Sequence, residues 1–309
     1  MLGPVLLAAS RSDRLRRVVA AAPVTRPVVD RFVAGDALHP AMDTVHTLTA
    51  GGLDVTLDHL GEDVTDRATA RHTRDAYLRL LETLALAGLG DRAEVSVKLS
   101  AFGQALPDGG HDVALENVRA VAELATATGT TVTLDMEDHT TVDSTLAVLH
   151  ELRRDHPGTG AVLQSYLFRT EDDARGLATA GSRVRLVKGA YKEPAHVAFQ
   201  DRRAVDRAYV RALRVLFEGD GYPMVGSHDP RMIAIAQDLA ARGRRAPGSY
   251  EFQMLYGIRT AEQRRLAAAG ERMRIYVPYG ADWYGYFMRR LAERPANLAF
   301  FLRSFAPSR

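Results

Sequence analysis

The sequence contains no cysteine, and it contains no apolar run long enough to cross a membrane. The absence of Cys excludes disulfides, thiolate metal sites and cysteine nucleophiles, and it fits a reducing compartment. A short apolar run opens the chain, but its charges follow the run instead of preceding it, so neither a signal peptide nor a membrane helix is predicted. We therefore expect a cytoplasmic protein.

Lysine is also scarce, because only Lys98, Lys188 and Lys192 stand among 40 basic residues. The chain uses Arg almost wherever it needs a cation, so a retained Lys suggests that a compact ammonium is required at that position. For Lys192, retention by chance explains the residue equally well. The net charge is only +2 and acidic and basic residues are interspersed, which predicts no nucleic-acid partner.

Several catalytic motifs are missing as well. The chain has no GxGxxG turn after its first predicted strand, no Walker sequence, no GxSxG and no HExxH. His59 and His139 are isolated, so no metal site is predicted.

Eight short runs rich in β-branched and aliphatic residues recur along the chain, and each precedes a segment long enough for a helix. The runs are 53–62, 93–103, 131–139, 160–167, 183–191, 223–230, 250–257 and 272–280. Eight such units predict a (βα)8 TIM-type barrel over residues 51–309, with an N-terminal helical segment over 1–50 packed on it. The alternative is an open doubly wound sheet, which the missing glycine-rich turn disfavours.

Polar and ionisable residues gather at the C-terminal ends of these runs, where a barrel places its chemistry. They are Glu62, Lys98, Asp135, Gln164, Arg185, Lys188, His228, Gln253 and Tyr276. Any one of them could have a purely structural role, such as helix capping by Asp135. A structural role does not explain polar residues at all eight strand ends together.

The last predicted helix follows the eighth run and reaches Pro295. On it Tyr286, Arg289, Arg290 and Glu293 recur at helical spacing, so they share one face. Two adjacent arginines are costly to bury unless an anion meets them, although a solvated surface pair is the alternative. With the lysines at the strand ends, they predict a cationic mouth for a small carboxylate and a phosphate-bearing cofactor.

The segments VSVKLSAFG, LDMED, LQSYL, RLVKGAY, GSHDP, EFQMLYG and YVPYGADWYGYFMRRLAERPAN resemble the proline dehydrogenases in their short, monofunctional bacterial form. The resemblance runs from about residue 50 to 300 with one motif per strand. It implies a (βα)8 barrel that holds FAD non-covalently. It also implies oxidation of L-proline to Δ1-pyrroline-5-carboxylate, with electrons passed to a membrane quinone through peripheral membrane contact.

The resemblance also implies roles for individual residues. The substrate would contact Lys98, Tyr191, Leu255, Tyr276, Tyr286, Arg289 and Arg290. The catalytic residues would be Asp135 and Arg185, with Arg185 beside flavin N5. The FAD contacts would be Met136, Gln164, Arg185, Lys188, Gly189, Ala190, Ser227 and His228. Glu62 would pair with Arg289 as a gate.

One departure from the family pattern is Asp229, which follows Ser227 and His228 where the family often has Thr-His-Asn. A carboxylate beside a phosphate is unfavourable, so we expect its side chain to point away. The alternative function is a Schiff-base aldolase or lyase, in which Lys98 or Lys188 has a depressed pKa and acts as an amine nucleophile. A non-enzymatic anion-binding barrel is a third reading.

Overall fold

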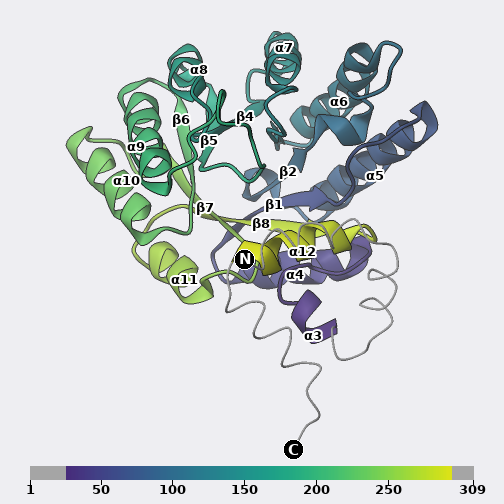
Figure 1. Ribbon diagram of the computed structural model, residues 1–309. Coiled ribbons are helices and arrows are strands. Elements are labelled where there is room, and N and C mark those ends of the chain that lie inside the picture. The colour runs from purple at the N-terminus through teal and green to yellow at the C-terminus, as the bar shows by residue number, and fades with distance from the viewer. Residues whose placement is uncertain (1–25, 294–309) are drawn as a thin grey trace, which may run out of the picture.

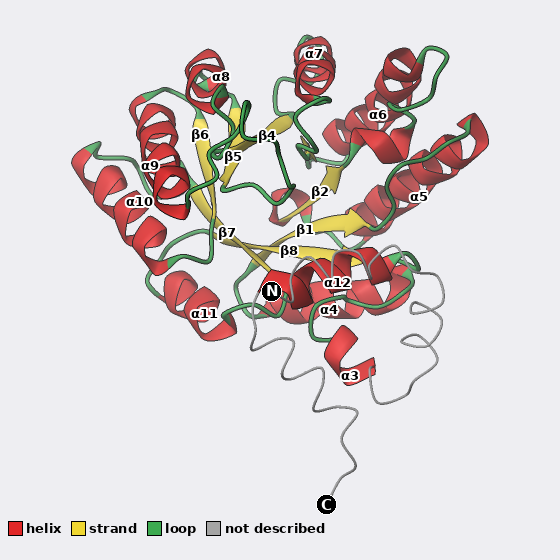
Figure 2. Ribbon diagram, in the orientation of Figure 1, coloured by secondary structure: helices red, strands yellow, loops and turns green. Residues whose placement is uncertain are grey.

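The computed structural model describes residues 26–293, in which eight parallel strands form a closed barrel (Figures 1 and 2). Each strand pairs with the next along the chain, and β8 pairs with β1 over six residues to complete the ring. The predicted (βα)8 fold is therefore confirmed.

The strands are β1 (Asp54–His59), β2 (Ala93–Val97), β3 (Val132–Leu134), β4 (Gly160–Gln164), β5 (Arg183–Val187), β6 (Tyr222–Gly226), β7 (Glu251–Leu255) and β8 (Met273–Tyr279). The helices are α3 (Arg26–Val29), α4 (Leu38–Ala50), α5 (Arg67–Leu86), α6 (Gly110–Ala127), α7 (Val142–Arg153), α8 (Thr170–Leu177), α9 (Arg202–Glu218), α10 (Pro230–Arg242), α11 (Thr260–Ala268) and α12 (Trp283–Glu293). Two short 3-10 turns, η2 (Gly90–Arg92) and η3 (Leu99–Phe102), flank β2.

The strands end earlier than the apolar runs predict. The run 93–103 forms only β2 and then turns into η3, and the run 131–139 contributes three residues to β3. The polar residues at the ends of these runs lie in the loops beyond the ladder. This placement brings them to the mouth of the barrel instead of into its wall.

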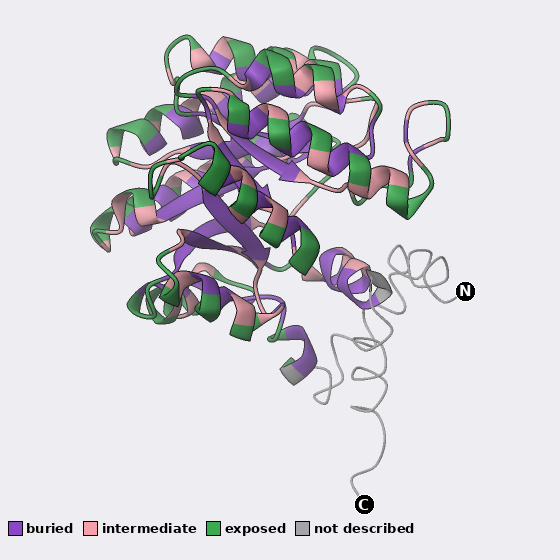
Figure 3. Ribbon diagram, turned by 90° about the vertical axis from the view of Figure 1, so that its left-hand side faces the viewer, coloured by how far each residue is buried: buried purple, intermediate pink, exposed green. Residues whose placement is uncertain are grey.

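The outer face of the barrel is apolar and packs against the ring of helices, whose inner faces are buried (Figure 3). Alternate strand residues point into the barrel, and many of these inward residues are polar. Thr56, for example, is in register with Glu94 on one side and with Tyr276 on the other.

A buried charge network fills the lower part of the barrel. Arg274 is 1% exposed, and its Nε donates to Glu251 Oε1 at 2.9 Å. Glu94 accepts bonds from Thr56 at 2.8 Å and from Arg183 at 2.8 Å. Buried charges of both signs therefore meet partners here, as their burial requires.

The N-terminal helices pack against the barrel in two ways. Helix α4 places Ala41, Met42 and Val45 in the main core. The first described helix of the predicted helical segment 1–50 is only the single turn α3, and Phe32 beyond it packs 6.4 Å from Phe287 of α12, measured between ring centroids. The division of the chain at residue 50 stays a prediction.

Residues 1–25 and 294–309 lie outside the described part of the chain, so the predicted start of the N-terminal helices and the helix end at Pro295 belong to segments the structure does not describe. Among the helices of residues 26–293, none is long and apolar enough to cross a membrane.

Candidate active site

A cavity of about 600 Å³ opens at the C-terminal ends of the strands. Of the predicted site residues, all except Glu62 line it, and Glu62 lines a smaller cavity that shares Lys98, Tyr286 and Arg289 with it. Residues that are separated by up to two hundred positions in the sequence therefore meet in one place, as the strand-end argument predicts.

Helix α12 brings its aromatic and cationic face to the cavity. The guanidinium of Arg290 lies over the ring of Tyr286, 5.0 Å from its centroid, and Arg290 is buried. Arg289 Nη1 donates to Glu62 Oε1 at 2.8 Å. Burial alone would raise the pKa of Glu62, but the charge and hydrogen bonds of Arg289 outweigh it and lower the pKa. The predicted Glu62–Arg289 pair is thus present as an ion pair.

Lys98 reaches the cavity from the end of β2 and is held by a carboxylate that the sequence analysis did not identify. Both oxygens of Asp58 accept from Lys98 Nζ, at 2.9 and 2.8 Å, and Asp58 is buried. Burial alone would lower the pKa of Lys98, but Asp58 and Asp135 outweigh it and raise the pKa above its ordinary value. The depressed pKa expected of Lys98 in the aldolase reading is therefore wrong.

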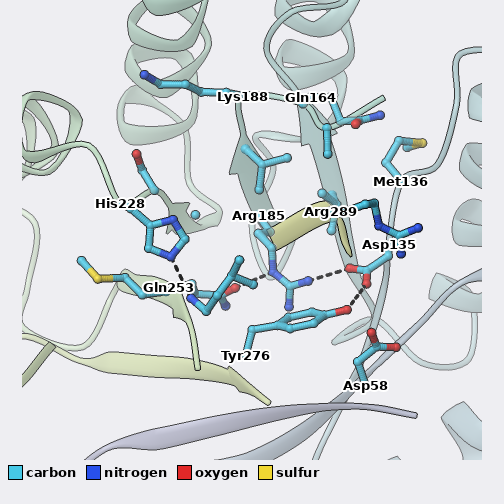
Figure 4. Close-up of a pocket in the computed structure, with 18 of the residues that line it drawn as sticks. Asp58, Asp135, Met136, Gln164, Arg185, Lys188, His228, Gln253, Tyr276 and Arg289 are labelled. Atoms are coloured by element: carbon cyan, nitrogen blue, oxygen red, sulfur yellow. Dashed lines mark hydrogen bonds and ion pairs between the residues drawn. The ribbon is translucent and has the colours of Figure 1, made fainter. Parts of the chain in front are cut away.

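Arg185 lies at the centre of the cavity floor in a fixed set of bonds (Figure 4). Its Nη1 donates to Asp135 Oδ1 at 2.7 Å and to Ser96 Oγ at 3.0 Å. The other oxygen of Asp135 accepts from the Tyr276 hydroxyl at 2.6 Å. Burial and the neighbouring Asp135 charge raise the pKa of Tyr276, so the hydroxyl remains a donor.

Gln164 at the end of β4 and Gly189 after β5 line the wall of the cavity. Gln164 Nε2 donates to the carbonyl oxygen of Glu137 at 2.7 Å, and its Oε1 accepts from the Tyr166 hydroxyl at 3.3 Å. Gly189 has a φ of 115°, and an added Cβ would lie 2.4 Å from two ring atoms of Tyr166. Only glycine therefore fits at this turn, which leaves backbone beside the cavity instead of a side chain.

Lys188 sits on the rim between two acidic residues. Its Nζ donates to Asp206 Oδ1 at 2.5 Å and to Asp229 Oδ2 at 2.8 Å. Asp229 lines the cavity and also caps α10 by accepting from the Arg231 amide at 3.0 Å. The ammonium of Lys188 and the guanidinium of Arg231 both hold the Asp229 carboxylate, and the expectation that it points away from a phosphate stays a prediction.

His228 precedes α10 and is held by backbone groups. Its Nε2 accepts from the Leu255 amide at 2.9 Å, so a neutral ring carries its proton on Nδ1. Its own carbonyl oxygen accepts from Arg259 Nη1 at 2.6 Å. The loops after β6 and β7 are thereby fixed to each other.

Two residues at the site, Asp58 and Asp206, were not identified from the sequence. The alternation of Asp54, Thr56 and Asp58 in β1 could have indicated an inward polar face. Asp206 lies on α9, and no local pattern distinguishes it from a surface carboxylate.

The cavity has the features that a flavin dinucleotide requires. Its volume lies within the range of cofactor sites, and Leu255, Tyr191 and Tyr286 supply apolar surface. Backbone at Gly189 suits a phosphate, and the fixed amide of Gln164 suits the edge of a heterocycle. The residues present therefore fit FAD.

Comparison with known proteins agrees with this geometry. A family profile described as proline dehydrogenase matches residues 41–303. The chain belongs to the proline dehydrogenase family. Among curated members of this family, proline dehydrogenase 1 of Bacillus subtilis (strain 168) is 39% identical over 303 residues, 98% of each chain. Proline dehydrogenase of Deinococcus radiodurans is 41% identical over 277 residues, 88% of each chain.

Solved structures of other proteins share the barrel. Proline utilization A from Bdellovibrio bacteriovorus, inactivated by N-propargylglycine, superposes with a TM-score of 0.80 at 25% identity. A mutant of Bradyrhizobium japonicum proline utilization A superposes with a TM-score of 0.71 at 22% identity, which supports the fold alone. The chain covers 34% of the first protein and 32% of the second, about a third of each.

Proposed function

We propose that the protein oxidises L-proline to Δ1-pyrroline-5-carboxylate with a bound FAD, as the first step of proline catabolism, and passes the electrons to a membrane quinone. The observation that supports this function best is the arrangement of α12, which presents two arginines and an aromatic ring to the cavity beside Lys98. An amino acid with a small apolar ring offers the matching carboxylate and hydrocarbon surface.

Binding of the substrate follows from these groups. Arg289, Arg290 and Lys98 would hold the carboxylate, and charge-assisted hydrogen bonds of this kind are about twice as strong as neutral ones. Tyr191, Tyr286 and Leu255 would hold the ring. The binding energy at the carboxylate would fix the ring carbon in place, which is the main requirement for a transfer that needs no nucleophile.

Bound FAD would supply a hydride acceptor at N5 for the hydrogen on proline C5. Arg185 would contribute a fixed positive charge where reduction deposits negative charge. Asp135 holds the guanidinium in place, and Tyr276 in turn holds Asp135. Gln164, Met136, Ala190, Ser227 and His228 would complete the flavin site. The Glu62–Arg289 pair closes over the substrate side in our proposal, and opening it would free Arg289 for the carboxylate.

The aldolase alternative is disfavoured by the state of its lysine. A Schiff base needs a neutral amine. Lys98 instead donates hydrogen bonds to both carboxylate oxygens of Asp58, and its pKa is raised. Lys188 is likewise bound to two carboxylates.

An anaerobic visible spectrum before and after addition of L-proline tests the proposal. We expect flavin bands that bleach with L-proline, but not with D-proline or with prolinamide, which lacks the carboxylate. Re-oxidation by a soluble quinone analogue would then test the acceptor. Bands that stay unbleached would refute the substrate, and a protein that stays colourless after incubation with FAD would refute the cofactor.

A further inference from the structure

Gln253 lies at the middle of β7, on the inner face of the barrel, and is 4% exposed. Its Oε1 accepts a short hydrogen bond from Arg185 Nε. Its Nε2 donates to Glu251 Oε1 at 2.5 Å and approaches Met224 Sδ at 3.2 Å. The amide therefore joins the cavity floor to the buried charge network below it. Figure 4 labels Gln253 and Arg185, which form the part of this connection at the cavity floor.

The orientation of this amide is determined by its two neighbours. Glu251 accepts from Arg274 Nε at 2.9 Å and from the Tyr222 hydroxyl at 3.0 Å, and Arg274 outweighs burial to keep the pKa of Glu251 low. A flipped amide would place its oxygen against the Glu251 carboxylate and its NH₂ against the Nε–H of Arg185. Both contacts would be repulsive, so only one orientation is compatible with the network.

Gln253 and Asp135 hold opposite edges of the Arg185 guanidinium. Asp135 and Ser96 bind Nη1, whereas Gln253 binds Nε. The nearest remaining carboxylate, Glu94, lies 3.6 Å from Nη2. Two held edges fix the plane of a guanidinium, whereas one held edge leaves it free to tilt.

The neutrality of the amide matters as much as its position. A carboxylate at position 253 could also accept from Arg185 Nε, but it would add a further counter-ion to Asp135 and Glu94. It would also stand beside the buried carboxylate of Glu251, which is unfavourable. An amide holds the guanidinium without adding charge.

We propose that Gln253 is a positioning residue for the oxidation. It fixes the Arg185 guanidinium in one plane without neutralising it, and thereby keeps that charge available to stabilise the reduced flavin. This inference rests on the proposed function, because it assigns Arg185 to the flavin. Gln253 itself would not touch the substrate.

The test compares Gln253→Leu with the matched variant Gln237→Leu. Gln237 lies on α10 and donates to Glu271 Oε1 at 2.9 Å on the outside of the barrel, so it loses the same kind of amide–carboxylate bond far from Arg185. The measurements are flavin content, the reduction potential of the bound flavin by dye equilibration, the rate of flavin reduction at saturating proline, and KM.

For Gln253→Leu we expect a reduction potential lower by at least about 30 mV, a tenfold change in the two-electron equilibrium. The reduction rate should fall at least tenfold while KM changes less than about threefold, because two of the three residues proposed to hold the carboxylate lie on α12. Flavin content and the properties of Gln237→Leu should stay near those of the wild type. Should Gln253→Leu fail to fold, Gln253→Met, which keeps the side-chain length, replaces it.

Gln253→Glu supplies a second arm. At low pH its carboxyl should be protonated beside Glu251 and behave like the amide, and as the pH rises its ionisation should lower the potential further relative to wild type. The inference is overturned if the Leu or Met variant keeps the wild-type potential and reduction rate. It is also overturned if flavin content and stability fall while the remaining flavin keeps its potential, which is a purely structural role.

These outcomes are separable from failure of the proposed function. Dye equilibration does not use proline, so a wild-type flavin that proline cannot bleach refutes the substrate while the comparison of potentials still decides the role of Gln253. A wild-type protein that binds no flavin overturns both.

Discussion

Replacing Arg289 by alanine should weaken proline binding far more than flavin binding. Arg289 lies on the cavity face of α12, and its Nη1 donates to Glu62 Oε1 at 2.8 Å. In the proposed complex the guanidinium leaves Glu62 for the substrate carboxylate. The variant lacks that cation and leaves Glu62 without its ion-pair partner.

The magnitude follows from the bond that is lost. A hydrogen bond to a charged partner contributes about 1.5–3 kcal/mol, which corresponds to about 10- to 150-fold in affinity. The unpaired Glu62 carboxylate adds repulsion toward an anionic substrate, so the effect should lie in the upper half of this range. Its side chain is 34% exposed, which lets water screen part of that repulsion.

The assay is a titration of anaerobic flavin bleaching with L-proline, together with the flavin-to-protein ratio from the visible spectrum. Glu62→Gln is the control, because it breaks the ion pair but keeps Arg289, and it should leave affinity within about threefold of wild type if the arginine contributes mainly to substrate binding. Equal losses of flavin and of proline affinity in Arg289→Ala would refute the substrate role.

Three further predictions concern other parts of the molecule. Gly189→Ala should lower flavin content on purification, because its Cβ would lie 2.4 Å from the Tyr166 ring at a φ of 115°, and unchanged content would contradict the close-packed turn. Burial lowers the pKa of His59, so the folded protein binds fewer protons there than the unfolded chain and loses stability as the pH falls below about 6.5. His59→Phe keeps a ring at this position and should reduce the loss of thermal stability at low pH. A pH profile of thermal unfolding identical to that of the wild type would argue against a buried neutral His59. Treatment with a carbonyl compound and borohydride should leave Lys98 unmodified, because Asp58 keeps its amine charged. Mass spectrometry checks this result, and a trapped adduct on Lys98 would restore the aldolase reading.

Most of the fold was predictable because one pattern repeats eight times. Each unit combines a short apolar run with a helix-length segment, and the mouth residues follow because parallel strands all end on one side. The ends of the strands were less predictable. The apolar character of the runs continues past the ladder into turns such as η3, where Leu99 and Phe102 are buried without belonging to a strand.

The partners of the predicted residues could not be read from the sequence. Lys98 was singled out by the rarity of lysine, but its bond to Asp58 depends on how β1 and β2 face each other inside the closed barrel. The position of Asp229 depends on Lys188 and on Asp206 from a helix outside the barrel. Such contacts are set by tertiary packing, which local spacing does not record.

The two ends of the described chain meet beside α12, the helix that carries Arg289 and Arg290. The amide of Ala34 donates to the carbonyl oxygen of Pro278 at 2.9 Å, and that of Gly280 donates to Gly35 at 3.0 Å. Val28, Val29 and Phe32 share an apolar cluster with the side chains of α12. These contacts join segments some 250 residues apart in sequence, and long-range contacts of this kind slow folding.

The order of synthesis gives this arrangement a consequence. A chain emerging from the ribosome presents β3 to β6 before α12 exists, whereas the proposed carboxylate-binding face requires α12 packed on the early segment that contains Phe32. The proposed substrate side is therefore the last part of the cavity that the growing chain can complete.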